Sequence, residues 1–139
     1  MQTRVAVYGT NGSNPLFLAG VSRFCQYTAS KNGSQINLLL DTLYTTKPTL
    51  AALAYYAKVQ PGSCQGNPAS CYCSLLGGSD LFGGINAAGG GWVLQQNPTD
   101  VLEACIFPDE SSIDSFGLFY HSAGIIRGIN LARVLRYHK

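Results

Sequence analysis

Charged residues are scarce in this chain, and their scarcity limits what it can be. Asp, Glu, Lys and Arg make up 12% of its 139 residues, against about a quarter in an ordinary soluble domain. Hydrophobic residues supply 46%. Intrinsic disorder requires the opposite balance, so the composition excludes a disordered chain. A chain of this length suits a single domain, residues 1–139, that buries one modest core.

Long apolar runs and basic clusters are also missing. The longest apolar run, residues 50–57, falls well short of the roughly eighteen residues that a membrane-spanning helix needs. The net charge of +2 is too small to favour nucleic-acid binding. Basic residues do lean towards the C-terminus, and we interpret them as part of a solvated last element rather than as a phosphate or membrane contact. They are Arg127, Arg133, Arg136 and Lys139.

No signal peptide is visible in residues 1–20, because Arg4 stands alone and no continuous apolar stretch follows it. The chain nevertheless has five cysteines, together with low charge, and this combination suggests an oxidising compartment. We therefore expect an exported protein (periplasmic, lipid-anchored or extracellular) numbered from an added Met1 after its signal peptide. The alternative is a cytosolic chain with reduced thiols. The odd number of cysteines leaves at least one thiol unpaired or pairing between chains.

Hydrophobic alternation and turn signals predict the strands of the first half. Residues 3–8 alternate as an opening strand, and the turn-forming run from Gly9 to Pro15 predicts a loop after it. Asn32-Gly33 predicts a hairpin with a two-residue turn, in which both residues have positive φ. It follows a strand expected in the second half of residues 17–30. It precedes a half-buried strand at 36–41, whose outward face includes Asn37.

Helix-start and helix-stop signals predict the first two helices. Thr46 is a candidate N-cap with Pro48 in the first turn, and Pro61-Gly62 would end this helix. Asn67 is the candidate N-cap of the second helix, which starts at Pro68 and is stopped by Gly77-Gly78.

Later elements are a strand, a turn, a third helix and an ambiguous tail. Residues 92–94 are expected to form a strand between 81 and 107, and Pro108-Asp109 is expected to turn the chain. Residues 113–120 are expected to be helical, and residues 125–137 fit a strand or a helix equally well. The whole pattern predicts an α+β domain with an antiparallel sheet, two or three short helices and one or two disulfides.

Cys71-Tyr72-Cys73 lies in the second predicted helix. Zinc sites usually place two or more residues between paired cysteines, so this spacing is a weak metal signal, and we expect no metal or other cofactor. Residues two apart on a helix point about 200° apart, so the two thiols would have different partners. A Cys73–Cys105 bridge would close a loop of about thirty residues and contribute roughly 3–4 kcal/mol. Cys71 could reach Cys64 or Cys25.

The run from Gly83 to Gly91 is rich in glycine, as phosphate-binding loops are. Such loops precede a helix and are followed by Lys-Ser or Lys-Thr. Here Trp92-Val93-Leu94 follows, which is typical of a strand and contains no lysine. We interpret the run as a hairpin tip.

The residue types present would allow two catalytic arrangements, but no motif in the surrounding sequence supports either. Cys25 or Cys73 could pair with His121, oriented by Asp114, but a histidine near a helix end often only caps carbonyls. A hydrolytic carboxylate pair would draw on four acidic residues that by default are solvated turn residues. These are Glu103, Asp109, Glu110 and Asp114. We expect no enzyme.

Residues 67–120 resemble a small bacterial family of undefined function whose members are labelled hemolysins and are typically exported or lipid-anchored. The shared pattern is Asn-Pro-Ala-Ser/Ala-x-Tyr-Cys, then Gly-Gly, then Cys-x-Phe/Leu-Pro and an acidic, aromatic helix. This chain has these blocks at 67–73, 77–78 and 105–108, and the helix includes Asp114 and Phe116. The resemblance covers about two fifths of the chain.

The chain departs from the family pattern at several points. Cys71 stands at a usually apolar position, Glu110 where glycine is common, and Phe116 near a usual Trp. The segment between the glycine pair and Cys105 is longer than usual, and residues 1–60 form a strand-hairpin-helix extension outside the match. The resemblance implies export and a Cys73–Cys105 disulfide more strongly than any activity.

We predict a non-enzymatic exported binding, inhibitory or cell-envelope module. Its partner would be an unidentified protein or cell-envelope component, with no nucleic acid, and the sequence does not support a membrane contact. One alternative is a membrane-acting, hemolysin-like toxin, as the family label suggests, and another is a small thiol enzyme. The candidate contact residues are Trp92, Phe116 and Tyr120.

Overall fold

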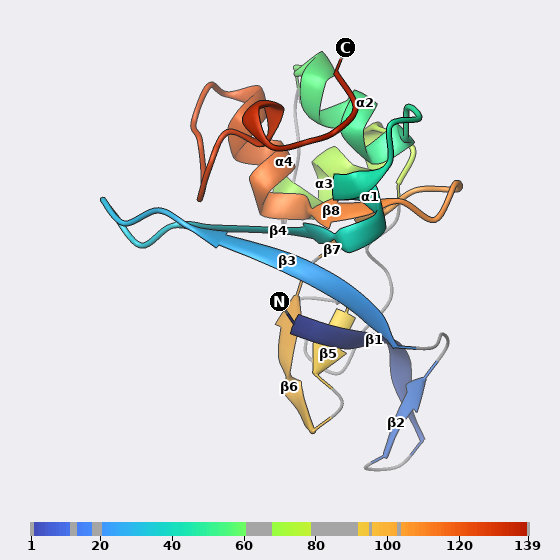
Figure 1. The fold of residues 1–139 in the computed structure, drawn as a ribbon. Helices are drawn as coiled ribbons and strands as arrows, with labels where there is room; N and C mark the ends of the chain where they lie inside the picture. The colour runs from blue at the N-terminus through green and yellow to red at the C-terminus, as the bar shows by residue number, and fades with distance from the viewer. Residues whose placement is uncertain are drawn as a thin grey trace.

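A computed structural model describes residues 2–11, 14–17, 21–60, 68–78, 92–94, 96–102 and 104–138 (Figure 1). Within these residues, eight strands form one connected sheet in the order β6-β5-β1-β3-β4-β8-β7, with β2 paired to β1. Every strand pair is antiparallel. The strands are β1 (Gln2–Asn11), β2 (Asn14–Phe17), β3 (Ser22–Thr28), β4 (Gln35–Leu39), β5 (Trp92–Leu94), β6 (Asn97–Leu102), β7 (Ala104–Ile106) and β8 (Ser112–Asp114).

Four α-helices in the described residues lie on one side of β3, β4, β7 and β8, whereas β1, β5 and β6 extend on the other side (Figure 1). The arrangement confirms the predicted α+β class, with four helices in place of two or three. The helices are α1 (Leu40–Tyr44), α2 (Leu50–Ala57), α3 (Pro68–Leu75), α4 (Ser115–Ser122) and a short 3-10 helix, η1 (Leu131–Arg133).

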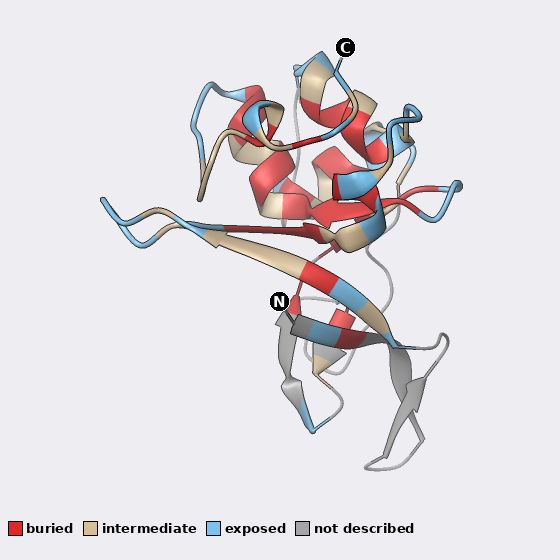
Figure 2. Ribbon diagram, viewed as in Figure 1, coloured by how far each residue is buried: buried red, intermediate tan, exposed pale blue. Residues whose placement is uncertain are grey.

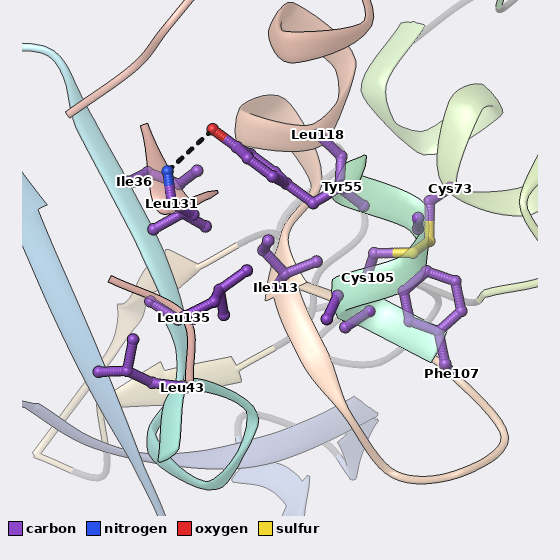
Figure 3. Close-up of a cluster of buried hydrophobic side chains, with 14 of the residues drawn as sticks. Ile36, Leu43, Tyr55, Cys73, Cys105, Phe107, Ile113, Leu118, Leu131 and Leu135 are labelled. Atoms are coloured by element: carbon purple, nitrogen blue, oxygen red, sulfur yellow. Dashed lines mark hydrogen bonds between the residues drawn. A yellow bond between two sulfur atoms is a disulfide. The ribbon is translucent and has the colours of Figure 1, made fainter. Parts of the chain in front are cut away.

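The larger core lies between the helices and the sheet, where Figure 2 shows most of the buried residues. Ile36 and Leu38 of β4 and Ile113 of β8 are fully buried there. Figure 3 shows the Cys73–Cys105 disulfide in this core beside Phe107. The predicted disulfide is therefore present, and it ties α3 to β7 from inside the core.

A second, smaller core cluster consists of Phe24, Trp92, Leu102 and Ala104. The rings of Phe24 and Trp92 lie 5.5 Å apart at an angle of 57°. Trp92 is only 7% exposed, so it is a core residue and not the surface contact that the sequence suggested. The strand predicted at residues 92–94 is confirmed as β5.

The loop predicted from Gly9 to Pro15 is wrong at its five described residues, which lie in strands, while Gly12 and Ser13 lie outside the described residues. Strand β1 continues to Asn11, and β2 starts at Asn14, with Thr10 paired to Pro15 and Asn11 to Asn14. Backbone pairing overrides the weak preferences of turn-forming residues, since a ladder satisfies each N–H and C=O group. Proline is tolerated because β2 pairs with β1 alone, at a margin of the sheet.

The predicted hairpin at Asn32-Gly33 joins β3 to β4, but its turn differs from the expected one. Only Gly33 has a positive φ, of 73°. The Gly33 amide donates to the carbonyl of Ala29, and the Ala29 amide donates to the carbonyl of Ser34. The turn is therefore longer than two residues, and Asn32 instead accepts the Ser34 amide through its side chain.

Helix α2 starts three residues later than predicted because tertiary contacts supply its N-terminal acceptors. Thr49, not Thr46, is the N-cap and accepts the Ala52 amide. The Leu50 amide donates to Asp109 and the Ala51 amide to Ser111, both in the β7–β8 turn. These partners lie about sixty residues away in the sequence, so a local capping signal could not identify them. The helix ends at Ala57, while Pro61-Gly62 lies outside the described residues.

Helix α3 begins at Pro68 and ends before Gly77-Gly78, as predicted, and Gly77 has a φ of 89°. Its candidate N-cap, Asn67, lies outside the described residues, as does the run from Gly83 to Gly91. The Pro108-Asp109 turn is also present, closed by a bond from the Glu110 amide to the Phe107 carbonyl.

Two predictions for the C-terminal region need correction. Residues 113–114 belong to strand β8, and α4 starts after them at Ser115. They are drawn into the sheet by pairing with β7 and β4. The described part of the tail contains neither a strand nor an α-helix, and its one regular element is the short 3-10 helix η1. Instead it packs Leu131 and Leu135 into the larger core.

Candidate functional site

A partly open hollow of about 340 Å³ lies beside β4, β8 and α4. This volume is at the low end of the range for small-molecule sites. Of the seven described residues that line it, four have polar or charged side chains other than rings, and two are aromatic residues of α4. The lining residues are Gln35, Asn37, Leu102, Asp114, Phe116, Tyr120 and Arg127.

Asp114 joins two of the elements beside the hollow, because it is the last residue of β8 and the N-cap of α4. Its Oδ1 accepts the amides of Phe116 and Gly117 at 3.0 and 3.2 Å. Its Oδ2 accepts from the backbone amide and the side-chain Nδ2 of Asn37 at 3.3 and 3.4 Å. Burial raises the pKa of Asp114, although these donors and Arg127 oppose the shift.

Asn37 contributes the most unusual atom of the hollow. It is only 6% exposed, and its Nδ2 donates a hydrogen bond to the Asp114 Oδ2. Its Oδ1 is buried and has no hydrogen-bond donor among the described residues. A buried acceptor without a partner costs about 1–3 kcal/mol.

Arg127 and two rings of α4 form the outer wall. The Arg127 Nε donates to the backbone carbonyl of Gln35 at 3.2 Å, which fixes the guanidinium beside β4. Its guanidinium carbon lies 5.4 Å from the centre of the Tyr120 ring, within the range of a cation–π contact. The rings of Phe116 and Tyr120 lie 6.5 Å apart at 28°. Both predicted contact residues of α4 therefore line the same hollow, and both are half-buried.

The catalytic set built on Cys73 is not formed, because this sulfur is in the Cys73–Cys105 disulfide. His121 does not meet Asp114 through Nδ1, which lies 2.9 Å from the carbonyl of Tyr55. A carbonyl only accepts, so Nδ1 carries the proton. The His121 ring also stacks on Tyr55, with 3.7 Å between ring centres.

His121 is thus a capping histidine, but of α2 and not of its own helix. The Tyr55 carbonyl lies in the last turn of α2, whose final carbonyls lack partners within the helix. Burial and the charge of Lys58 lower the pKa of His121, against the effect of the bond to Tyr55. The ring is held neutral in the core.

The structure also shows the bonding state of two of the remaining three cysteines. Cys71 is disulfide-bonded, like Cys73 and Cys105. Cys25 is a free, half-buried thiol in β3, so a Cys71–Cys25 bridge is excluded. Cys64 lies outside the described residues.

The acidic residues of the predicted carboxylate pair have separate roles. Asp109 accepts the amides of Leu50 and Ser111 and so joins the β7–β8 turn to α2. These bonds lower the pKa of Asp109 despite its partial burial. Glu110 is exposed in the same turn, and Glu103 lies outside the described residues. Among the described residues, no group of three or more His, Cys, Asp or Glu side chains could hold a metal ion.

Sequence reasoning missed Gln35, Asn37 and Arg127 as members of one site. The alternation of β4 predicts that Asn37 lies on the solvated face of the strand, opposite Ile36 and Leu38. It does face away from them, but a second polar layer with Asp114 covers it. The pairing depends on contacts between residues 77 positions apart, and no local signal reports such a contact.

Comparison with protein-family models, curated proteins and solved structures yields no match to this chain. No helix in the described part of the chain is long and apolar enough to cross a membrane. The candidate site therefore rests on its own geometry.

Proposed function

We propose that this chain is a non-enzymatic, exported binding module that holds a small polar ligand in the hollow between β4 and α4. The observation that carries the proposal is the buried Asn37 Oδ1, which has no hydrogen-bond donor in the described part of the chain and belongs to a residue that lines the hollow. A ligand hydroxyl or amide N–H that donated to this oxygen would relieve the cost of the unsatisfied acceptor. In an exported module, the ligand would belong to a protein or a cell-envelope component.

The disulfide supports export. Cys73 and Cys105 are both fully buried, and a structural bridge of this kind is typical of proteins that mature in an oxidising compartment. The family resemblance points to the same location. A core that is covalently joined also suits a small module that presents a preformed site, since less conformational entropy is lost on binding.

The test is an NMR titration of the ¹⁵N-labelled protein with a library of small polar compounds that includes neutral sugars, amino acids, blocked peptides and carboxylates. We expect saturable shifts of the Asn37, Phe116 and Tyr120 signals with at least one class, and no shift of Leu75, which is exposed and is not among the described lining residues of the hollow. Absence of shifts at the hollow with the whole library would contradict the proposal. So would dye release from liposomes at micromolar protein concentration, which would favour the membrane-acting alternative.

A further inference from the structure

The charges around the hollow disfavour an ionic ligand. Among the described residues that line it, the charged ones are Asp114 and Arg127, which have opposite signs. An anion would approach the Asp114 carboxylate, and a cation would compete with the Arg127 guanidinium that already lies on the Tyr120 ring. Placing like charges next to each other in a binding site costs binding energy. A neutral ligand avoids both penalties.

The hydrogen-bonding groups and the rings together define the ligand further. Asn37 supplies an unsatisfied acceptor, and the terminal N–H groups of Arg127 and the Gln35 amide are donors. The half-buried Phe116 ring adds an apolar surface at the same place. A ligand that fits must therefore donate and accept hydrogen bonds in several directions and also present an apolar face to a ring.

A peptide added as an extra strand does not suit this site. Strand β4 is paired on both sides, with β3 and with β8, and β8 is paired with β7 as well. The hollow therefore presents no strand edge at β4 or β8 to which an extended backbone could bond. The recognition groups are side chains, which favours a ligand recognised through its own side groups.

We infer that the hollow binds a neutral carbohydrate, with one sugar ring packed on Phe116 and its hydroxyls bonded to Asn37, Gln35 and Arg127. A sugar has a C–H face that packs on an aromatic ring, and each hydroxyl both donates and accepts. A hydroxyl donating to the Asn37 Oδ1 would satisfy the buried acceptor. This inference rests on the proposed binding function and names its ligand class.

The test uses neutral trisaccharides (cellotriose, chitotriose and maltotriose) as probes, with a blocked alanine tripeptide and sodium acetate as counter-probes. Binding is followed by ¹⁵N NMR shifts, including those of the Asn37 side-chain amide. We expect at least one trisaccharide to shift the hollow signals. Phe116→Ala should weaken this binding about tenfold. Tyr44→Ala removes a ring that is 54% exposed outside the hollow, and it should leave binding unchanged.

A second variant keeps the test decisive where Phe116→Ala loses its fold, as judged from its NMR spectrum. Gln35 is exposed, so Gln35→Ala should fold normally and weaken trisaccharide binding about three- to tenfold. Shifts at the hollow with the tripeptide or acetate but with no trisaccharide would overturn the carbohydrate inference and leave the binding function standing. No shifts with any probe or library compound would overturn both.

Discussion

Asp114 and His121 are buried ionisable residues whose pKa values shift in opposite directions. Burial raises the pKa of Asp114 above 3.8. The folded state therefore binds this proton more tightly than the unfolded chain does. Its contribution to stability is complete below pH 3.8 and is lost as the pH rises through the folded pKa.

We predict that Asp114→Asn lowers the free energy of unfolding by about 2–3 kcal/mol. An asparagine at this position would cap α4 through its Oδ1, but its Nδ2 would then face the two N–H donors of Asn37. Urea unfolding at neutral pH measures the effect. Asp41→Asn makes the same change at an exposed position in the first turn of α1, where the cost should stay below about 1 kcal/mol. Equal costs at the two positions would contradict the assigned role.

Because the pKa of His121 is lowered, we predict that the protein loses stability on mild acidification. The His121 pKa is lowered from 6.5, so below that value the unfolded chain takes up a proton more readily than the folded state. The contribution of His121 is complete above pH 6.5 and is lost as the pH falls through the folded pKa. For one proton the slope is at most about 1.4 kcal/mol per pH unit.

Urea unfolding at several pH values between neutral and mildly acidic tests this expectation. His121→Gln should unfold with a shallower dependence on pH than the unmodified chain, whatever its stability at neutral pH. His138→Gln removes a histidine from an exposed position and should leave the dependence as it was. Parallel curves for all three proteins would show that His121 does not titrate on unfolding.

At the scale of elements, the approach of α4 to β4 depends on a glycine inside the helix. A Cβ atom at Gly117 would lie 2.5 Å from Cδ1 and 2.6 Å from Cγ1 of Ile36, closer than atoms can approach without displacement. The glycine therefore permits the helix to pack closely on the strand that carries Asn37. The distance between α4 and β4 also sets the shape of the hollow.

We predict that Gly117→Ala destabilises the protein by about 1–3 kcal/mol, although the same change usually stabilises a helix by up to about 1 kcal/mol. Thermal unfolding of the single variant and of Gly117→Ala/Ile36→Val measures the effect, and the smaller valine should recover part of the loss. Ser74→Ala, at an exposed position of α3, is the matched control and should change stability little. A stabilising Gly117→Ala would mean that α4 does not pack this closely.

At the scale of the whole molecule, the Cys73–Cys105 disulfide joins segments 32 residues apart. We predict that the double variant Cys73→Ala/Cys105→Ala loses about 3–4 kcal/mol of unfolding free energy, because the unfolded chain is no longer constrained. Urea unfolding measures the loss. Cys25→Ser changes the free thiol and leaves the disulfide in place, so it should cost much less. Comparable losses would show that the disulfide is not what stabilises the core.

Local patterns determined much of this protein without its structure. Five cysteines and few charges predicted disulfides, and the hairpin and helix signals, among them the helix bounded by Pro68 and Gly77-Gly78, predicted an α+β fold. The Asn32-Gly33 hairpin, the strand at residues 92–94 and the Pro108-Asp109 turn were also predicted. These features depend on composition or on residues adjacent in the chain, whose conformational preferences act without distant partners.

Only the tertiary structure decided where distant residues meet. Helix α2 begins at its observed residue because Asp109 and Ser111 accept its first amides. Trp92 is buried because Phe24 packs on it. Asn37 and Asp114 form one polar layer across two strands, and Phe116, Tyr120 and Arg127 complete the hollow beside them. Contacts of this kind depend on the energy of long-range packing and pairing, which periodicity and local propensity do not contain.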